Sequence, residues 1–236
     1  IGGLAYLLKK INVPIYGTRL TLALVKGKLE EHGLLNTAKL FEVQPRKTVH
    51  LGCMAVEFIN VNHSIPDAVG MAIHTPAGII VHTGDFKVDF SPVDGSVIDL
   101  ARFGELGSRG VLALMADSTN AERVGFTRSE RTVGGSFEKL FEKAGSKRII
   151  IATFSSNIHR IQQIIDNAVR HKRKVAVFGR SMVHVMGTAL ELGYLKVPEG
   201  TIIDIDDMNR YPDEQVVLIT TGSQGEPMSA LTRMAM

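Results

Sequence analysis

A threefold repeat of strand, small polar turn and helix in the second half of the chain constrains the fold most. Hydrophobic runs of strand length recur at residues 148–153, 174–178 and 215–220. Each is followed by small polar residues and then by a helix-like segment, and a further helix is expected over 129–144 with Val133, Phe137, Leu140 and Phe141 facing inward. This alternation predicts an α/β unit with a parallel sheet whose polar turns lie along one edge.

The three polar turns carry groups that suit anions. We expect them at helix N-termini, where unpaired backbone amides and the helix dipole attract phosphate. Ordinary N-capping explains any one of them equally well, so a phosphate-binding rim and simple capping both stay open. The candidates are Ser155, Ser156 and Asn157 in the first turn, Arg180 and Ser181 in the second, and Gly222 and Ser223 in the third.

The first half of the chain has a different texture. A helix from Thr18, its expected N-cap, to about Glu31 is followed by four strands at 48–51, 54–61, 68–75 and 78–83. A short helix near 98–103 and a buried strand over 110–116 come next. Cys53 lies in a hydrophobic run and is expected in the core, and the lack of a second cysteine excludes a disulfide framework and favours a reducing compartment.

Three strands of this half run into residues that can bind metals. His63 follows the strand at 54–61, Asp85 follows the strand at 78–83, and Asp117 follows the strand at 110–116. An imidazole and a carboxylate at the ends of neighbouring strands can point into one cleft, which is a common way to build half of a metal site. A turn or capping role is the alternative for each residue.

Composition sets few limits on partners. A net charge of +3 permits a polyanionic partner without requiring one. Hydrophobic runs are too short for a membrane span and no signal peptide is evident, so no membrane partner and a cytoplasmic location are expected. The chain opens without methionine and closes in a helix-like segment, which leads us to expect a longer parent protein.

Taken together, these motifs resemble the ribonuclease J family of the metallo-β-lactamase superfamily, which carries a β-CASP domain. The resemblance covers nearly the whole chain in family order, at residues 63–67, 82–87, 117–120, 153–160, 177–181 and 221–227. It implies an incomplete metallo-β-lactamase αββα sandwich over residues 1–125 and a partial, inserted β-CASP domain over residues 126–236.

The resemblance also implies a zinc-dependent ribonuclease of RNA maturation and decay, which cuts RNA internally and degrades it 5′-to-3′ from a 5′-monophosphate end. Two zinc ions, with manganese or magnesium as alternatives, would hold a hydroxide that attacks the phosphodiester. By resemblance His63 is a ligand of one metal, Asp85 is the catalytic carboxylate that bridges both, and Asp117 supports the site. Ser155, Ser156 and Asn157 would hold RNA near its 5′ end. RNA and further subunits, identical in a dimer or tetramer or paralogous, are the expected partners.

The chain departs from the family in its metal ligands. The main family motif, His-x-His-x-Asp-His, is missing, as are further histidine segments, so His63 and Asp85 form an incomplete site. This chain alone is therefore expected to bind metal weakly and to be inactive. The alternative function is a non-catalytic β-CASP module that binds RNA or acts as a scaffold. A nucleotide-binding domain is disfavoured because the chain lacks Gly-x-Gly-x-x-Gly and a Walker lysine.

Overall fold

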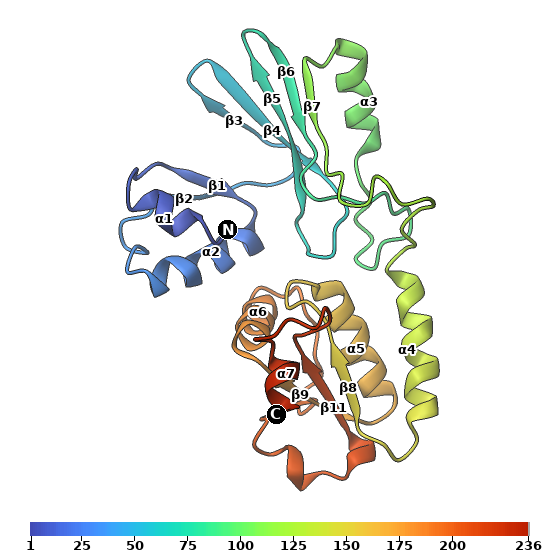
Figure 1. Cartoon of the computed structure of the whole chain (residues 1–236). Coiled ribbons are helices and arrows are strands. Elements are labelled where there is room, and N and C mark those ends of the chain that lie inside the picture. Colours follow the sequence, from blue (N-terminus) through green and yellow to red (C-terminus); the bar gives the residue numbers. More distant parts are fainter. Residues whose placement is uncertain (236) are drawn as a thin grey trace. The chain divides into compact units, whose positions relative to one another are not determined.

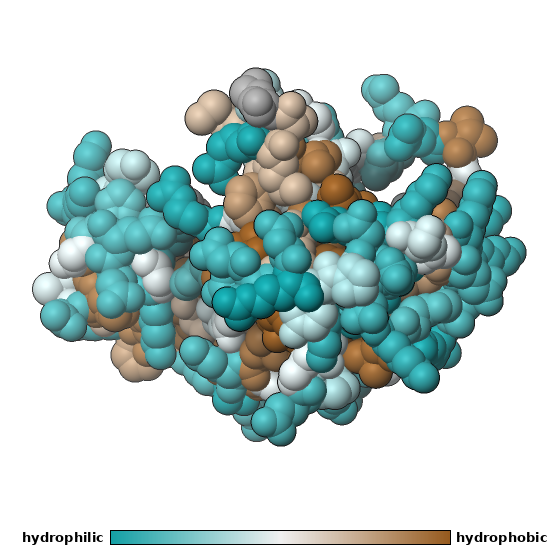
Figure 2. Space-filling view, turned by 90° about the horizontal axis from the view of Figure 1, so that it is seen from below, coloured by the Kyte–Doolittle hydropathy of each residue, from teal (hydrophilic) through white to brown (hydrophobic). Residues whose placement is uncertain are grey.

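The computed structural model describes residues 1–235 and has the predicted mixed α/β architecture (Figure 1). The chain divides into two compact units, residues 1–127 and residues 128–236. No helix of the described residues is both long and hydrophobic enough to cross a membrane. Most of the surface visible in Figure 2 is hydrophilic, with hydrophobic side chains gathered in several separate patches.

A five-stranded sheet dominates the first unit. In spatial order it contains β3 (Thr48–Leu51), β4 (Met54–Asn60), β5 (Val69–Thr75), β6 (Gly78–His82) and β7 (Ala113–Met115). The first four strands are antiparallel and match the predicted ranges closely, whereas β7 runs parallel to β6. The assignment of this unit to a metallo-β-lactamase sandwich stays a prediction.

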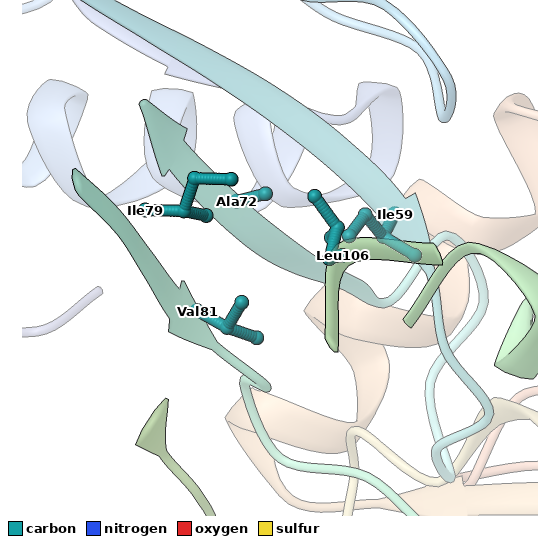
Figure 3. Packing of buried hydrophobic residues seen from close by; sticks show 5 residues of the cluster. All are labelled: Ile59, Ala72, Ile79, Val81 and Leu106. Carbon is teal, nitrogen blue, oxygen red and sulfur yellow. The ribbon is translucent and has the colours of Figure 1, made fainter. Parts of the chain in front are cut away.

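One face of the sheet is covered by α3 (Leu100–Arg109). Alternating side chains of β4, β5 and β6 pack against buried Leu106 of this helix: Ile59, Ala72, Ile79 and Val81 (Figure 3). Full burial of an aliphatic side chain of this size contributes about 1.5–3 kcal/mol. The helix begins after Asp99, which caps it by accepting a hydrogen bond from the Arg102 backbone N–H at 3.1 Å, and it continues to Arg109, beyond its predicted end near 103.

Two expectations for this unit are wrong. The predicted buried strand over 110–116 is an edge strand, and Leu112, Leu114 and Met115 are 63%, 65% and 55% exposed, because β7 pairs with β6 alone. Cys53 is exposed rather than in the core, because it lies with Gly52 in the tight turn that joins β3 to β4.

A smaller group of elements precedes the sheet. α1 (Leu4–Leu8) and α2 (Arg19–Glu31) pack with a parallel pair of strands, β1 (Ile15–Gly17) and β2 (Leu40–Glu42). The helix predicted after Thr18 is confirmed. Thr18 is its N-cap residue, as predicted, but the Thr18 hydroxyl donates to the Thr21 hydroxyl at 3.1 Å and accepts no hydrogen bond from a backbone N–H of the described residues.

The second unit contains the predicted parallel sheet. Its strands, all parallel, are in spatial order β10 (Ile202–Ile203), β9 (Lys174–Phe178), β11 (Val216–Thr220) and β8 (Ile149–Ala152). All five residues of β11 are buried, as expected for a central strand covered on both faces. The two-residue strand β10 was not predicted. Two 3₁₀ turns, η1 (Met208–Arg210) and η2 (Asp213–Gln215), connect β10 to β11.

Four helices complete this unit: α4 (Arg131–Ala144), α5 (Ile158–Arg170), α6 (Arg180–Glu191) and α7 (Ala230–Met234). The predicted inward stripe of α4 is correct for buried Phe137 and Phe141 but wrong for Leu140, which is 58% exposed. Successive helical residues are about 100° apart. Leu140 therefore lies a third of a turn away from Phe141 and off the packed stripe.

Candidate metal residues and anion-binding turn

The structure brings His63 and Asp85 together. β4 and β6 both run antiparallel to β5, which lies between them, so their carboxyl ends meet at the same edge of the sheet. His63 Nε2 lies 3.9 Å from Asp85 Oδ2. The expectation that the two residues follow neighbouring strands is wrong, because β5 separates those strands. Their loops nevertheless meet, and the Lys87 backbone N–H donates to the Asn62 carbonyl at 2.8 Å.

The ligand atoms of this pair are accessible. The side chain of Asp85 is 79% exposed and that of His63 is 36% exposed. The hydroxyl of Ser64 lies 3.5 Å from His63 Nε2. An imidazole nitrogen beside two open carboxylate oxygens is a donor set that zinc and manganese accept.

Close backbone packing holds the loop that carries Asp85. Gly84 has a φ of +62°, and a side chain there would place Cβ 2.7 Å from the Val69 carbonyl oxygen. The Gly84 N–H donates to His82 Nδ1 at 3.0 Å, so His82 has a structural role in this loop. The sequence signal for this packing was Gly84 itself, directly before the candidate carboxylate.

Asp117 lies at the same edge of the sheet, because β7 runs parallel to β6. Its backbone N–H donates to the Thr83 hydroxyl at 3.0 Å. Hydrogen bonds from the hydroxyl and backbone N–H of Thr119 lower the pKa of Asp117, with smaller contributions from the Phe86 backbone and the nearby charge of His63. Within residues 1–235, however, no group of three or more His, Cys, Asp or Glu side chains could enclose a metal ion.

The first polar turn lies between β8 and α5. Asn157 is buried and is the N-cap of α5: its side-chain oxygen accepts a hydrogen bond from the Arg160 backbone N–H at 3.1 Å. Ser156 is exposed and Ser155 is half-buried. At the base of the turn, the Thr153 hydroxyl is buried and has no hydrogen-bond partner among the described residues. A buried hydroxyl of this kind is costly without a partner, which is consistent with a ligand or water at this turn.

The other two turns lie at the same edge, because β8, β9 and β11 are parallel. Exposed Arg180 and Ser181 form the first turn of α6, as predicted. Gly222 and Ser223 are not at a helix N-terminus, which corrects that expectation. The loop continues past them, and Ser229 caps α7 by accepting from the Thr232 backbone N–H at 3.2 Å.

Comparison with known proteins shows what the chain is similar to. Residues 146–236 match the family description "Ribonuclease J, beta-CASP domain". Over its whole length the chain is 47% identical to ribonuclease J of Synechocystis and 50% identical to ribonuclease J 1 of Streptococcus pyogenes. The chain is similar to the ribonuclease J family along its whole length. It covers 37% and 42% of these two relatives, so it spans about two fifths of their length.

The other similarities agree with this similarity to the ribonuclease J family. Ribonuclease J of Thermus thermophilus is 47% identical over the whole chain, which covers 42% of that relative. A solved structure from Enterococcus faecalis, described as a protein of unknown function, matches with a TM-score of 0.65. That match covers 90% of this chain and 54% of the other at 15% identity, and it shows the fold alone.

Sequence reasoning missed one contact beside the first polar turn. Arg160, on the first turn of α5, forms a two-pronged ion pair with Glu130, at 2.7 Å through Nε and 3.1 Å through Nη2. The signal was weak, because thirty residues separate the partners. Two basic residues nearby are also paired: Arg170 contacts Glu138 at 2.8 Å, and Lys174 donates to the Gly200 carbonyl at 2.7 Å.

Proposed function

We propose that this chain supplies part of the metal site and the RNA-binding turn of a metal-dependent ribonuclease that hydrolyses phosphodiester bonds. The observation that carries the proposal is the 3.9 Å approach of His63 Nε2 to Asp85 Oδ2 at an open sheet edge. The names of its close relatives, which are ribonucleases, support the same activity. We extend the proposal to internal cleavage and to 5′-to-3′ degradation in a cytoplasmic setting.

His63 and Asp85 fit two donor positions of a zinc or manganese site. The further ligands of such a site would have to come from other residues. Two metal ions, when bound, supply hydroxide at neutral pH and stabilise charge on phosphate oxygens. Asp85 offers two exposed oxygens for such ions, and His63 offers one nitrogen. Asp117, held ionised by Thr119, stabilises positive charge near His63 without being a ligand.

The turn at Ser155, Ser156 and Asn157 is proposed to bind the 5′ monophosphate of RNA. The two serine hydroxyls offer neutral donors, and the start of the 13-residue α5 adds the positive end of the helix dipole, which together suit a phosphate. Asn157 contributes by shaping the turn as a cap. Arg180 and Ser181 would contact the following phosphates, and Gly222 and Ser223 would line the path as backbone donors. A second copy of the chain, or a paralogous subunit, completes the proposed assembly.

A second function, RNA binding without cleavage, is favoured by one observation. The described residues contain no group of three metal-ligating side chains. A chain with two ligands holds zinc far more weakly than a closed site does. In that case the unit would still bind RNA ends through the α5 turn.

The test separates these functions. Binding of fluorescent RNA with a 5′ monophosphate or a 5′ hydroxyl would be measured by anisotropy, for this chain and for Ser155→Ala/Ser156→Ala. We expect a preference for the monophosphate that the double variant loses.

Cleavage would be measured in the Synechocystis relative carrying this chain in place of its matching segment, with Asp85→Ala as control. Activity abolished by Asp85→Ala supports the nuclease. If the chimera folds and binds RNA but holds no metal and cuts no RNA, the result supports the second function, RNA binding without cleavage.

A further inference from the structure

Helices α4 and α5 run side by side in the same direction. Contacts between them advance along both helices together: Glu130 with Arg160, Gly134 with Gln163, and Glu138 with Arg170. At the middle contact the helices approach closely, since a Cβ atom on Gly134 would lie 2.7 Å from Gln163 Oε1. Two ion pairs therefore link the same two helices, one at the start of both and one further along.

The two ion pairs differ in burial and geometry. The Glu130 and Arg160 side chains are only 12% and 33% exposed, and two guanidinium nitrogens contact the two carboxylate oxygens. The Glu138 and Arg170 side chains are 39% and 66% exposed, and one nitrogen makes the short contact. Two-pronged, shielded pairs fix orientation better than exposed single contacts do.

Arg160 also contacts the first polar turn, at Ser155 to Asn157, through its backbone. Its backbone N–H donates a hydrogen bond to the side-chain oxygen of Asn157, the cap of α5, at 3.1 Å. Its side chain is held by Glu130, the residue directly before α4. Glu130, Arg160 and Asn157 thus form a continuous chain of contacts that ends in the turn with Ser155 and Ser156.

We propose that Glu130 is a positioning residue for this turn: through Arg160 it holds the start of α5, and with it the two serines, in the arrangement that binds a 5′ phosphate. The inference rests on the proposed function of the turn. In this arrangement the Arg160 guanidinium is engaged by Glu130 through Nε and Nη2 and does not serve as the phosphate ligand. Selectivity for the phosphate then comes from the two serine hydroxyls and the positive end of the α5 dipole.

The experiment asks whether replacing Glu130 strengthens or weakens RNA binding, because the two explanations predict opposite changes in affinity. Glu130→Gln removes a negative charge near a proposed anion site, so simple electrostatics predicts tighter binding of 5′-monophosphorylated RNA. Loss of positioning predicts weaker binding, by about threefold to tenfold. The matched control is Glu138→Gln, which breaks the other α4–α5 ion pair and should leave the affinity within about twofold. Affinity would be measured by anisotropy on the 236-residue chain, with thermal melts of each variant.

Charge reversal provides a second readout. Glu130→Arg and Arg160→Glu should each weaken binding, and the double variant should recover most of the affinity. Tighter binding by Glu130→Gln, or equal losses for the Glu130 and Glu138 variants, would overturn the positioning role. If Ser155→Ala/Ser156→Ala binds monophosphorylated RNA as the unmodified chain does, the proposed function of the turn fails instead. Loss in the serine variant with no loss in Glu130→Gln overturns this inference alone.

Discussion

His63 Nε2 and Asp85 Oδ2 lie 3.9 Å apart although a complete strand, β5, separates the strands that they follow. Because β5 reverses the chain between β4 and β6, both residues emerge at one edge of the sheet. Neither side chain belongs to the hydrophobic core, and that of Asp85, at 79% exposed, can be replaced with little loss of packing.

The first prediction concerns metal affinity. Asp85→Asn and His63→Ala should each weaken zinc binding by at least about tenfold, because each removes one of two adjacent donors. Since the Asp85 side chain is 79% exposed, its replacement should leave the melting temperature nearly unchanged. Isothermal titration and thermal melts would measure both quantities. Asp94→Asn, in an exposed loop, is the control and should bind zinc as the unmodified chain does.

The second prediction concerns the loop that carries Asp85. Gly84→Ala should destabilise the first unit by about 2–4 kcal/mol, because it combines a left-handed φ of +62° with a Cβ atom 2.7 Å from the Val69 carbonyl oxygen. Gly95→Ala shares the left-handed φ, at +78°, but meets nothing within 4 Å, so it should cost only about 1–2 kcal/mol. Urea denaturation of the two variants would compare them. Equal losses would show that the carbonyl contact contributes nothing.

The third prediction concerns pH. A side-chain hydrogen bond with Arg102 holds the pKa of Glu57 below its ordinary value of 4.5, with a smaller contribution from His74. A carboxylate with a lowered folded-state pKa stabilises the fold fully above the ordinary value, and that stability is lost as pH falls through the lowered pKa. The free energy of unfolding should therefore fall below about pH 4.5, and Glu57→Gln should flatten this dependence.

The matched control for the pH experiment is Glu105→Gln. Glu105 contacts the same guanidinium at 2.6 Å, but its side chain is 63% exposed, so its replacement should change stability by less than about 0.5 kcal/mol. A pH profile of Glu57→Gln as steep as that of the unmodified chain would contradict the role of Glu57.

The fourth prediction concerns the exposed edge strand β7. Leu112 and Leu114 are hydrophobic, mostly exposed and next to an unpaired strand edge, a combination that favours association. Leu114→Lys should lower the aggregate fraction in light scattering and change the free energy of unfolding by no more than about 0.5 kcal/mol. An unmodified chain that stays monomeric and melts cooperatively at high concentration would contradict this prediction.

Sequence reasoning predicted the regular elements well, because their periodic hydrophobic patterns are local. The parallel sheet of the second unit and the strands β3 to β6 illustrate this. It failed for β7, since the hydrophobic run at 110–116 reads the same whether or not another strand covers it. It also misplaced the third turn, because nothing local distinguished Ser223 from the true cap, Ser229.

The candidate site was predictable only in part. The sequence indicated His63, Asp85 and Asp117 as residues that follow strands, but the order of the strands decides which of them meet. The Glu130–Arg160 ion pair was beyond prediction, because it depends on how α4 and α5 pack.

The turn between β5 and β6, at Pro76 and Ala77, is exposed and lies at the opposite edge of the sheet from His63 and Asp85. Residues inserted there would lengthen the hairpin without moving either His63 or Asp85. That turn is therefore a natural attachment point for a dye or an affinity tag, and a position where homologues can differ in length at no cost to the chemistry.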